Sequence, residues 1–413
     1  MMEKREGYKK TEIGWLPEEW VLSPLEEISD ISMGQSPSSE AYNQENIGMP
    51  LIQGNADIRQ RLSKPRVWTS QITKTCDVDD ILMTVRAPVG AIANAVHNAC
   101  IGRGVCSIKP MNADRGYLYQ FLLSLEPKWG QIEQGSTFTA VNGKDVKAIN
   151  ITCPPLPEQK KIASILTTVD DKISSIDQQI QQTEQLKKGL MEKLLTEGIG
   201  HTEFKDTKIG RIPKGWKVVD LGDLVETTQL GLNIKASPSN QGIPMLKMGN
   251  LTIGGFNFSK IEKIDDDSID AYKDFVLKEG DFLFNTRNTP ELVGKSAAWK
   301  NNRLMLFNNN ILRIIFTKDA DSFYLSYYFS STLGWQKLKR ISKNTTSVGA
   351  IYTKDLMKIK IGRPPIEEQK KIATILSTVD DKIEVLNQKK TQYQTLKKGL
   401  SQQLLTGQIR VKI

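Results

Sequence analysis

Three short stretches of polar and basic residues occur twice in the chain, in the same order, although the copies share little sequence identity. The first ends an apolar run in Gly and Asn, the second leads from Asp through an apolar triplet to Arg, and the third is a Ser/Thr-rich loop that closes in Lys-Asp. They span 50–55 and 244–250, 80–86 and 281–287, and 135–145 and 344–355. Such side chains in strand ends and loops contact phosphates and base edges of DNA, so the repeated set predicts nucleic-acid binding.

The candidate contact residues are the polar and basic members of these stretches. They are Gln53, Asn55, Arg86, Thr137, Lys144, Lys247, Asn250, Arg287, Thr346 and Lys354. For any single member a structural role is the alternative, because Arg86 and Arg287 could pair with a neighbouring carboxylate and the Ser/Thr loops could cap turns. The recurrence of matching loops in two divergent regions favours a functional role for the set, though not for each residue.

The sequence offers little for catalysis within this chain. A metal-dependent nuclease needs clustered carboxylates with a lysine, and Glu158 with Lys160, repeated as Glu368 with Lys370, fits the pattern Glu-x-Lys. Both triplets fall in the first turn of a long helix, where capping and solvated charge suffice to explain them. A self-contained methyltransferase needs a Gly-rich cofactor loop, for which the pattern at 101–104 is too short, and an active-site motif whose flanking groups both Pro-Pro pairs lack.

Cysteine and histidine usage does not suggest a metal site. The chain has 4 Cys and 2 His, and no two cysteines have the Cys-x-x-Cys spacing. A zinc cluster is therefore unexpected, and a nucleophile triad based on histidine even more so. Buried free thiols are the preferred interpretation of the cysteines.

Bulk composition sets the broad class. A chain of 413 residues is long enough for two or three domains with their own cores. It carries 56 Lys plus Arg against 47 Asp plus Glu, and this net charge of +9 is compatible with nucleic acid without proving it. No apolar run is long enough to span a membrane, and the Lys-rich start does not resemble a signal peptide, so the cytoplasm is the expected location.

The elements that must position the candidate residues are defined by an internal repeat. Residues 154–200 align without a gap to residues 364–410, and more than half of the aligned positions are identical. Each copy starts at a Pro-Pro pair with acidic residues in the first turn, and a left-handed C-cap is expected at Gly198 and Gly407. About 40 residues at 1.5 Å per residue predict a helix of roughly 60 Å in each copy.

Apolar residues recur at steps of seven along both predicted helices, which is the pattern of a coiled coil. One seam consists of Ile162, Val169, Ile176, Thr183 and Leu190 in the first helix and Ile372, Val379, Leu386, Tyr393 and Leu400 in the second. We expect the two helices to pack on each other in antiparallel orientation; the alternative is that each seam packs on its own domain. Lys187, Lys390 and Lys397 interrupt the companion seam and predict packing there that is looser or faces a partner. Gly189 and Gly399 each cost a helix interior about 1 kcal/mol, which a close backbone approach or a kink could offset.

The regions between the helices are also related. A start motif at 8–20 recurs at 204–216 with Lys, Thr, Ile, Gly, Pro and Trp at matching places. The order is therefore domain, helix, domain, helix, and two such halves can close into a pseudo-twofold body. Short apolar runs predict strands at 50–52, 81–85, 105–108, 244–246, 282–284 and 311–316, and helical spacing predicts helices at 117–125 and 323–333.

These residues resemble a known family. The run P-P-L-x-E-Q-x-x-I-A-x-I-L that continues to K-K-G-L, at 154–196 and 364–407, resembles the helical regions of type I restriction-modification specificity subunits. The motif I-G-x-x-P-x-x-W, at 13–20 and 209–216, resembles the start of each target recognition domain in that family. The resemblance covers nearly the whole chain. One departure is Pro157, where the second copy has Glu, and a proline in the first helical turn should do no harm.

The resemblance implies a fold. It consists of two target recognition domains of α/β (α+β) type, joined by two long helices that form an antiparallel coiled coil, as a pseudo-twofold internal repeat. The expected boundaries are 1–153 and 201–363 for the recognition domains, and 154–200 and 364–413 for the helical spacers.

The resemblance also implies a function without catalysis in this chain. Each recognition domain is expected to read one half of a bipartite, asymmetric target in double-stranded DNA, while the helices set the spacer length and dock two modification subunits. S-adenosylmethionine, ATP and Mg²⁺ are expected on the modification and restriction partners, and no cofactor on this chain. A coiled-coil scaffold without DNA contact is the remaining alternative, but it leaves the matched Arg and Lys-Asp loops unexplained.

Overall fold

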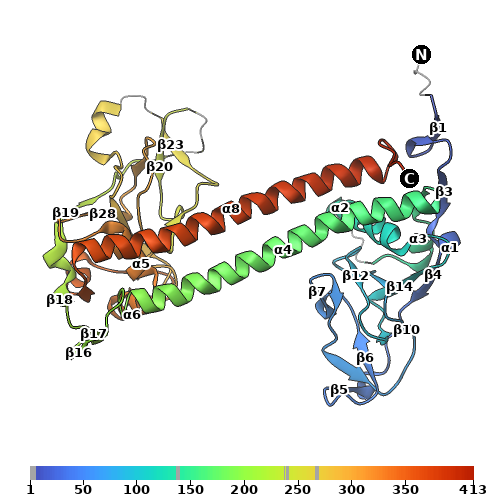
Figure 1. Ribbon diagram of the computed structural model, residues 1–413, viewed down its shortest axis with the longest axis horizontal. Helices are drawn as coiled ribbons and strands as arrows, with labels where there is room; N and C mark the ends of the chain where they lie inside the picture. The colour runs from blue at the N-terminus through green and yellow to red at the C-terminus, as the bar shows by residue number, and fades with distance from the viewer. Residues whose placement is uncertain (1–5, 136–139, 237, 239–240, 266–268) are drawn as a thin grey trace. The chain divides into compact units, whose positions relative to one another are not determined.

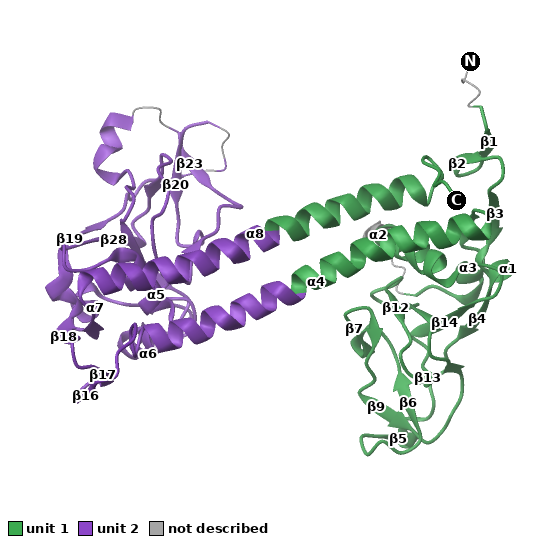
Figure 2. Ribbon diagram, viewed as in Figure 1, with its two compact units in different colours: residues 1–177, 388–413 green, residues 178–387 purple. Residues whose placement is uncertain are grey.

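Figure 1 shows the protein as a computed structural model. The structure describes residues 6–135, 140–236, 238, 241–265 and 269–413. The chain divides into two compact units, residues 1–177 with 388–413 (unit 1) and residues 178–387 (unit 2), as Figure 2 shows. Each unit contains a globular α/β part and a portion of both long helices.

Both globular parts are built on the same antiparallel four-stranded sheet. In unit 1 the order is β4-β14-β11-β12 (Ser29–Met33, Val105–Pro110, Ile81–Thr84, Ile92–Asn94), continued by β8 and β7 (Leu62–Ser63, Ile58–Arg59). In unit 2 the order is β19-β28-β24-β26 (Val225–Leu230, Ile311–Phe316, Phe282–Asn285, Ser296–Ala298). All four residues of β11 and of β24 are buried, which explains why these strands are apolar without alternation.

A second sheet contributes a parallel strand pair to each unit. The pair is β13 with β6 in unit 1 (Ala99–Ile101, Met49–Ile52) and β27 with β20 in unit 2 (Leu306–Phe307, Ile243–Leu246). An antiparallel neighbour completes both sheets, β9 (Val67–Thr69) and β23 (Glu262–Ile264), while β10 and β5 (Thr75–Cys76, Tyr42–Asn43) extend the sheet of unit 1. The internal repeat therefore includes the topology of the divergent regions, and all six strands expected from the sequence are confirmed.

The start motif of each half lies beside the strand that precedes its long helix. The motifs form hairpins, β1-β2 (Tyr8–Thr11, Gly14–Pro17) and β16-β17 (Phe204–Thr207, Gly210–Pro213). The next strands, β3 (Val21–Pro24) and β18 (Lys217–Asp220), pair with β15 (Asn150–Cys153) and β31 (Lys360–Arg363), which directly precede the long helices. Minor elements are α1 (Leu25–Ile28), α3 (Gly143–Lys147), α7 (Thr353–Leu356), β21-β22 (Leu251–Thr252, Gly255–Phe256) and four 3₁₀ turns (Ser39–Ala41, Asn55–Asp57, Leu221–Leu224, Ile269–Phe275).

The shorter helices differ from expectation at one point. The helix expected at 117–125 lies within α2 (Arg115–Gly135). The helix expected at 323–333 is two helices, α5 (Ser322–Ser330) and α6 (Thr332–Ile341). The helix is interrupted at Ser331, which takes an extended conformation. Ser331 is the N-cap of α6, and its hydroxyl accepts a hydrogen bond from the Gly334 N–H (3.2 Å).

The two long helices are α4 (Leu156–Leu194) and α8 (Ile366–Leu404), of 39 residues each. In each unit the start of one helix and the end of the other join the core of the globular part. Unit 1 has Ile162 and Leu166 of α4 and Leu404 of α8 in one cluster with Tyr117 and Leu122 of α2, and unit 2 has Ile372 and Leu376 of α8 and Leu194 of α4 with Tyr324 of α5. Near their ends, therefore, the helices pack both on a domain and on each other.

None of the helices in the described part of the chain combines the length and the apolar composition that a membrane span needs.

The lysines that interrupt the seam form ion pairs between the two helices. The pairs are Lys397 with Asp170 and Lys390 with Asp177 in unit 1, and Lys187 with Asp380 in unit 2, each with an N–O distance of 2.6 Å. In unit 1 a step of seven along α4 meets a step of seven backwards along α8, so the helices are antiparallel. Gln120 donates to Asp170 (2.7 Å) and Tyr327 to Asp380 (2.8 Å), which ties each globular part to the same network. Instead of loosening the seam, these lysines bridge it.

A carboxylate in the first turn of each long helix is held by residues far from it in sequence, and the one in unit 1 is fully buried. Glu158 has no exposed surface, and it accepts hydrogen bonds from Trp20 Nε1 (3.1 Å) and from Nε and Nη2 of Arg410 (2.7 and 2.8 Å). The expectation of a solvated charge at Glu158 is wrong, because the tryptophan of the start motif and the residues after α8 cover it. Burying a charge is costly unless it is paired, so both partners are needed to keep this carboxylate in place.

Unit 2 repeats this arrangement with different partners. Glu368 accepts hydrogen bonds from Trp216 Nε1 (3.1 Å) and from the backbone N–H of Ile199 (2.9 Å), and it contacts His201 Nε2 (2.9 Å). Gly198 precedes these residues with a φ of 68°, and Gly407, one place earlier in the repeat, has a φ of 69°, so both glycines take the left-handed conformation expected just past the helix ends.

A turn at residues 102–104 in unit 1 and 308–310 in unit 2 joins the two sheets of its unit. The same set of backbone hydrogen bonds holds the turn in both units, and we call this region the sheet junction. In unit 1 the bonds are Gly34 N to Val105 O (3.0 Å), Gly102 N to Ile52 O (2.8 Å) and Val85 N to Gly104 O (2.9 Å). In unit 2 they are Gly231 N to Ile311 O (3.1 Å), Asn308 N to Leu246 O (3.0 Å) and Thr286 N to Asn310 O (3.1 Å). The backbones approach so closely that a Cβ at Gly104 would lie 2.3 Å from Gln53 O, and one at Gly231 would lie 2.3 Å from Phe307 O.

Substitution of Arg410 should test the buried carboxylate. Arg410→Ala leaves Glu158 without its counter-charge, and we expect the free energy of unfolding to fall by about 3 kcal/mol. Glu19→Gln is the matched control, because Glu19 also pairs with Arg410 (2.9 Å) but its side chain is 68% exposed, so the loss should stay below about 1 kcal/mol. Urea unfolding of the isolated chain measures both, and equal losses would contradict a special role for the buried group.

Substitution of Gly104 should test the sheet junction. Gly104→Ala places a methyl group against the Gln53 carbonyl, and we expect a loss of about 2 kcal/mol in the free energy of unfolding. Gly189→Ala is the control, because a Cβ there meets nothing within 4 Å, and helix propensity predicts a gain of about 1 kcal/mol. If the two variants unfolded at the same urea concentration, the close approach in the junction would be refuted.

Candidate nucleic-acid interface

The structure joins two of the three repeated stretches in each unit. Arg86, just beyond the end of β11, forms a β-bridge with Ala140, and Arg287 in β25 (Arg287–Asn288) pairs with Ala350 in β30 (Gly349–Ala350). The backbone bonds from Val141 N to Val85 O (2.9 Å) and from Ile351 N to Thr286 O (3.0 Å) are equivalent as well. The arginine and the third repeated stretch, which the structure describes from Ala140 onward in unit 1, therefore form one site in each unit.

The two arginines and the two lysines of these stretches point away from internal partners. Arg86, Arg287, Lys144 and Lys354 are all exposed. Within the described ranges, none of the four has a carboxylate at ion-pair distance. This geometry does not support the structural alternative for Arg86 and Arg287, in which they pair with a neighbouring acid. Four solvated cations on the second and third repeated stretches can attract phosphate groups.

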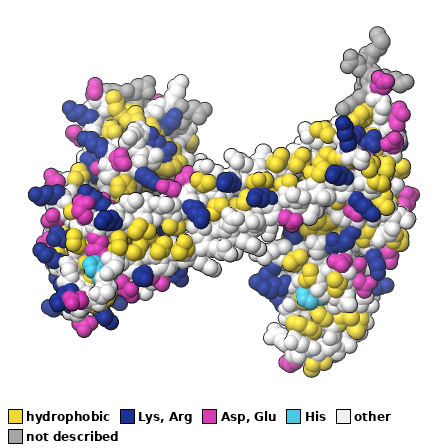
Figure 3. Space-filling view, in the orientation of Figure 1, with side chains coloured by type: hydrophobic (Ala, Val, Ile, Leu, Met, Phe, Trp, Pro, Cys, Tyr) yellow, Lys and Arg dark blue, Asp and Glu magenta, His cyan; other side chains and the backbone are white. Residues whose placement is uncertain are grey.

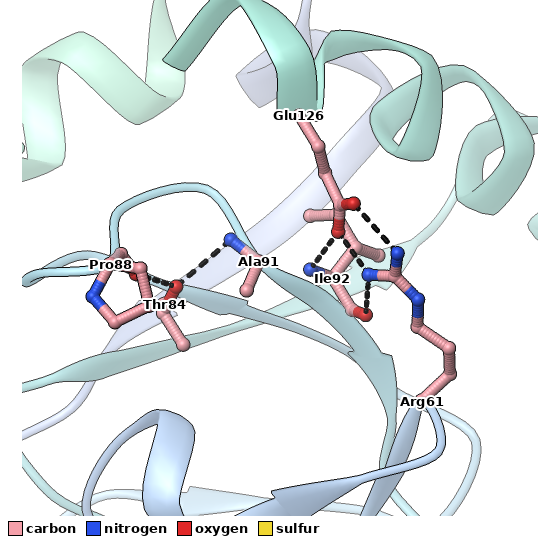
Figure 4. A network of polar contacts seen from close by, with 6 residues as sticks. All are labelled: Arg61, Thr84, Pro88, Ala91, Ile92 and Glu126. Atoms are coloured by element: carbon pink, nitrogen blue, oxygen red, sulfur yellow. Dashed lines mark hydrogen bonds and ion pairs between the residues drawn. The ribbon is translucent and has the colours of Figure 1, made fainter. Parts of the chain in front are cut away.

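Figure 4 shows how the loop after Arg86 is held in place. The Thr84 hydroxyl donates to Pro88 O (2.6 Å) and accepts from Ala91 N (2.9 Å), so one side chain links both sides of the loop. Glu126 of α2 accepts from Ile92 N (2.7 Å) and from Arg61 Nη2 (2.8 Å) at the start of the next strand. A loop anchored in this way can hold Arg86 in a fixed orientation.

The Ser/Thr-rich loop of unit 2 is a tight hairpin. Strands β29 (Lys343–Asn344) and β30 enclose a turn closed by a hydrogen bond from Thr345 N to Val348 O (2.8 Å). Thr346 is exposed in this turn, close to the strand that carries Arg287. Its counterpart in unit 1, Thr137, lies outside the described residues.

Lys144 and Lys354 lie in the short helices that follow these loops. Lys144 is in α3, which starts with a capping box in which Asn142 accepts from Asp145 N (3.1 Å) and Asp145 accepts from Asn142 N (3.1 Å). Lys354 takes the equivalent place in α7. The local hydrogen bonds thus fix the backbone, and the lysine side chains remain exposed.

The first repeated stretch differs between the units. In unit 1, Asn55 is exposed and Gln53 Nε2 donates to the Tyr42 hydroxyl (2.9 Å). In unit 2, Lys247 forms an ion pair with Glu262, and Asn250 is buried. The Asn250 amide donates to Asn257 O (3.0 Å) and Lys260 O (2.8 Å) and accepts from Lys247 N (2.8 Å). These internal bonds leave Lys247 and Asn250 as structural residues, and we do not include them in the interface.

The turn of the sheet junction presents two exposed residues that sequence reasoning did not select. Arg103 lies between Gly102 and Gly104, and Asn309 lies between Asn308 and Asn310. The turn is adjacent to the arginine strand, because Val85 and Thr286 bond to its last residue in the two units. The available signal in the sequence is the Gly-Arg-Gly pattern at 102–104, which by itself suggests a short cofactor loop rather than a DNA contact.

The described residues offer no metal centre. No group of three or more His, Cys, Asp or Glu side chains in the described ranges is arranged to hold a metal ion. Burial raises the pKa of the Cys76 thiol to about 11 and that of Cys106 to about 12, so both are protonated and unreactive at neutral pH. Glu158 of the Glu-x-Lys pattern is buried in the core of unit 1.

The face seen in Figure 3 has basic side chains interspersed with acidic ones on both units, so the net positive charge is not gathered into one broad patch there.

Three comparisons relate this geometry to known proteins. The model of the type I restriction modification DNA specificity domain matches residues 17–185 and again residues 213–394. The MjaVIII specificity subunit of Methanocaldococcus jannaschii is 33% identical over 302 residues, which are 72% of this chain and 70% of that protein. The MjaX specificity subunit of the same organism is 39% identical over 197 residues, which are 47% of this chain and 46% of that protein.

A solved structure has a similar fold over most of the chain. The S subunit of a type I restriction-modification system from M. genitalium superposes with a TM-score of 0.60 at 13% identity, covering 94% of this chain and 96% of that one. At this identity the similarity concerns the fold alone. The two matches of the family model, however, fall on the two halves of the internal repeat and together cover most of the sequence. The chain therefore belongs to the type I restriction modification DNA specificity family.

Proposed function

We propose that this chain is the DNA-reading subunit of a type I restriction-modification enzyme and carries no catalytic site of its own. The observation that supports this most directly is the repeated interface. Each unit places an exposed arginine beside the third repeated stretch, which leads to an exposed lysine, although the two regions differ in sequence. Such a set can bind the DNA backbone and bring neighbouring side chains to the bases.

Each unit reads one half of a bipartite target under this proposal. The two interfaces share their backbone frame and their Arg and Lys positions, but the sequences around these positions differ, so the two half-sites differ in sequence. The long helix α4 lies between the two globular parts in the chain, and α8 follows the second. We assign to both helices the role of fixing the length of the unspecified spacer, as half-site spacing is fixed by geometry in other DNA-binding proteins.

The partner subunits dock on the helices in this proposal. Leu186 of α4 and Leu396 of α8 occupy equivalent places in the repeat, and they are 54% and 48% exposed. Three residues further on, Gly189 and Gly399 have open space where a Cβ would lie, so packing within the chain does not explain why glycine stands there. An exposed leucine beside a helical glycine allows a partner helix to approach closely.

Leu186 with Gly189 and Leu396 with Gly399 form two equivalent surfaces, which we call the leucine patches. Two equivalent patches suit two copies of one partner, and we assign them to two modification subunits. These would carry S-adenosylmethionine, while restriction subunits in the full complex would carry ATP and Mg²⁺. Cofactor chemistry would then take place on the partners, and this chain would contribute the choice of DNA sequence.

Mapping of adenine methylation across the source genome tests the proposal. The map is recorded by single-molecule sequencing with the gene present and then deleted. We expect one asymmetric bipartite motif with a fixed gap to lose its methylation on deletion. A methylation map that is identical in both strains would refute the proposal for this locus.

The arginines of the two interfaces should act on separate half-sites. Arg86→Ala should weaken or abolish recognition of the half-site read by unit 1, and Arg287→Ala that of the other, because each arginine belongs to one unit. Binding of the assembled methyltransferase to DNA that keeps only one intact half-site measures this. Equal damage to both half-sites from either substitution would mean that these arginines are structural.

The leucine patches should control partner stoichiometry. Leu186→Glu or Leu396→Glu should reduce the bound modification subunits from two to one, and the double variant should bind none, since a charge on each patch opposes an apolar contact. Val385→Glu is the control, because Val385 is 48% exposed on α8 but its counterpart in α4 is Ser175, so it belongs to no repeated apolar patch. Light scattering gives the mass of each complex. Unchanged stoichiometry in the double variant would place the docking surface elsewhere.

A further inference from the structure

The turn of the sheet junction has the same backbone in both units but a different side chain at its tip. Equivalent hydrogen bonds hold its first residue, Gly102 N to Ile52 O and Asn308 N to Leu246 O, at 2.8 and 3.0 Å. Its tip residue is Arg103 in unit 1 and Asn309 in unit 2, and both are exposed. The chemistry of the tip therefore changes while its position in the fold does not.

The neighbouring positions of the interface behave in the opposite way. Lys144 and Lys354 are both lysines, and both copies of the third stretch are rich in Ser and Thr. A contact to the phosphate backbone carries no sequence information, so the same residue can serve in two different half-sites. A contact to a base edge must change when the base changes. The tip of the turn is thus the position in this interface where specificity would be encoded.

The polar groups at the tip are available for such a contact. The backbone N–H of Arg103 donates to Ser36 Oγ (3.1 Å), and in the described part of unit 1 its guanidinium has no hydrogen bond or ion pair. In unit 2, Asn309 Nδ2 donates to Asn233 Oδ1 (2.8 Å), and Asn233 follows β19 as Ser36 follows β4. This bond orients the Asn309 amide and still leaves its Oδ1 and a second N–H for a ligand.

We propose that Arg103 reads a guanine in the half-site of unit 1 and that Asn309 reads an adenine in the half-site of unit 2. The inference rests on the proposed DNA-reading function and extends it to two base pairs. A guanidinium donates two parallel hydrogen bonds to O6 and N7 of guanine, and a carboxamide accepts from N6 and donates to N7 of adenine. Both patterns lie in the major groove of DNA.

Variants of the tip residues, in the full chain assembled with its modification subunits, test the inference. Methylation is measured on a plasmid library in which each base of both half-sites is varied. Arg103→Ala should lower discrimination for guanine at one position of one half-site by at least about 5-fold, and should leave the other half-site unchanged. Asn309→Ala should do the same for an adenine in the other half-site. Arg103→Lys should retain the preference for guanine, since Lys also pairs with its O6 and N7.

Lys144→Ala serves as the control for a backbone contact, since Lys144 is exposed in the same unit. It should weaken methylation of all library members alike. If Arg103→Ala also weakened methylation of all members alike, or changed the preference at no position, the base-reading role of Arg103 would be overturned. The proposed function would still stand in that case, provided the wild-type complex shows a bipartite motif. If the wild-type complex showed no bipartite motif in the library, the proposed function itself would fail.

Discussion

The carboxylate in the first turn of each long helix, fully buried in unit 1 and partly buried in unit 2, is the constraint on which the rest of each unit depends. Glu158 has no exposed surface, and its charge is compensated by Arg410, a residue 252 positions away. A carboxylate in this position would be strongly unfavourable until Arg410 and Trp20 arrive. The globular part of unit 1 is therefore complete only when the end of α8 has docked on it, and Glu368 imposes the same condition on unit 2 through Ile199, His201 and Trp216. Two halves related by sequence thus exchange their helix ends to complete their cores.

Features determined by local pattern could be predicted from the sequence. Steps of seven identified the long helices and their seams, and Gly198 and Gly407 were placed at C-caps because a left-handed residue there suits glycine. The ion pairs of Lys390 and Lys397 could not be foreseen, since they depend on how two helices are aligned with each other. The burial of Glu158 could not be foreseen either, because an acidic residue in a first helical turn has a sufficient local explanation in the helix dipole.

In the candidate interface, too, residues in a repeated local pattern could be predicted, whereas contacts between distant segments could not. Repetition identified Arg86 and Arg287, whereas their pairing with Ala140 and Ala350 required the structure, because strand pairing between loops leaves no local signal. Asn250 was selected for its polar side chain, but sequence does not distinguish an amide that stabilises its own loop from one that contacts a ligand. Arg103 and Asn309 were not recognised as equivalent, since Gly-Arg-Gly and Asn-Asn-Asn share no residue and only the common hydrogen bonds relate them.

The way the sheet junction is held explains how one fold can serve two different DNA sequences. Its turn is fixed by hydrogen bonds between backbone groups, which do not depend on the side chain at the tip. The turn of unit 1 contains Gly102 and Gly104, whereas that of unit 2 contains Asn308, whose Oδ1 accepts from Asn310 N (3.3 Å). The tip residue therefore adds little to the stability of the fold, and exchanging an arginine for an asparagine there leaves the frame intact. A protein that must recognise unlike half-sites with related domains can vary such a position freely, whereas Glu158 and Glu368 must stay because the cores form around them.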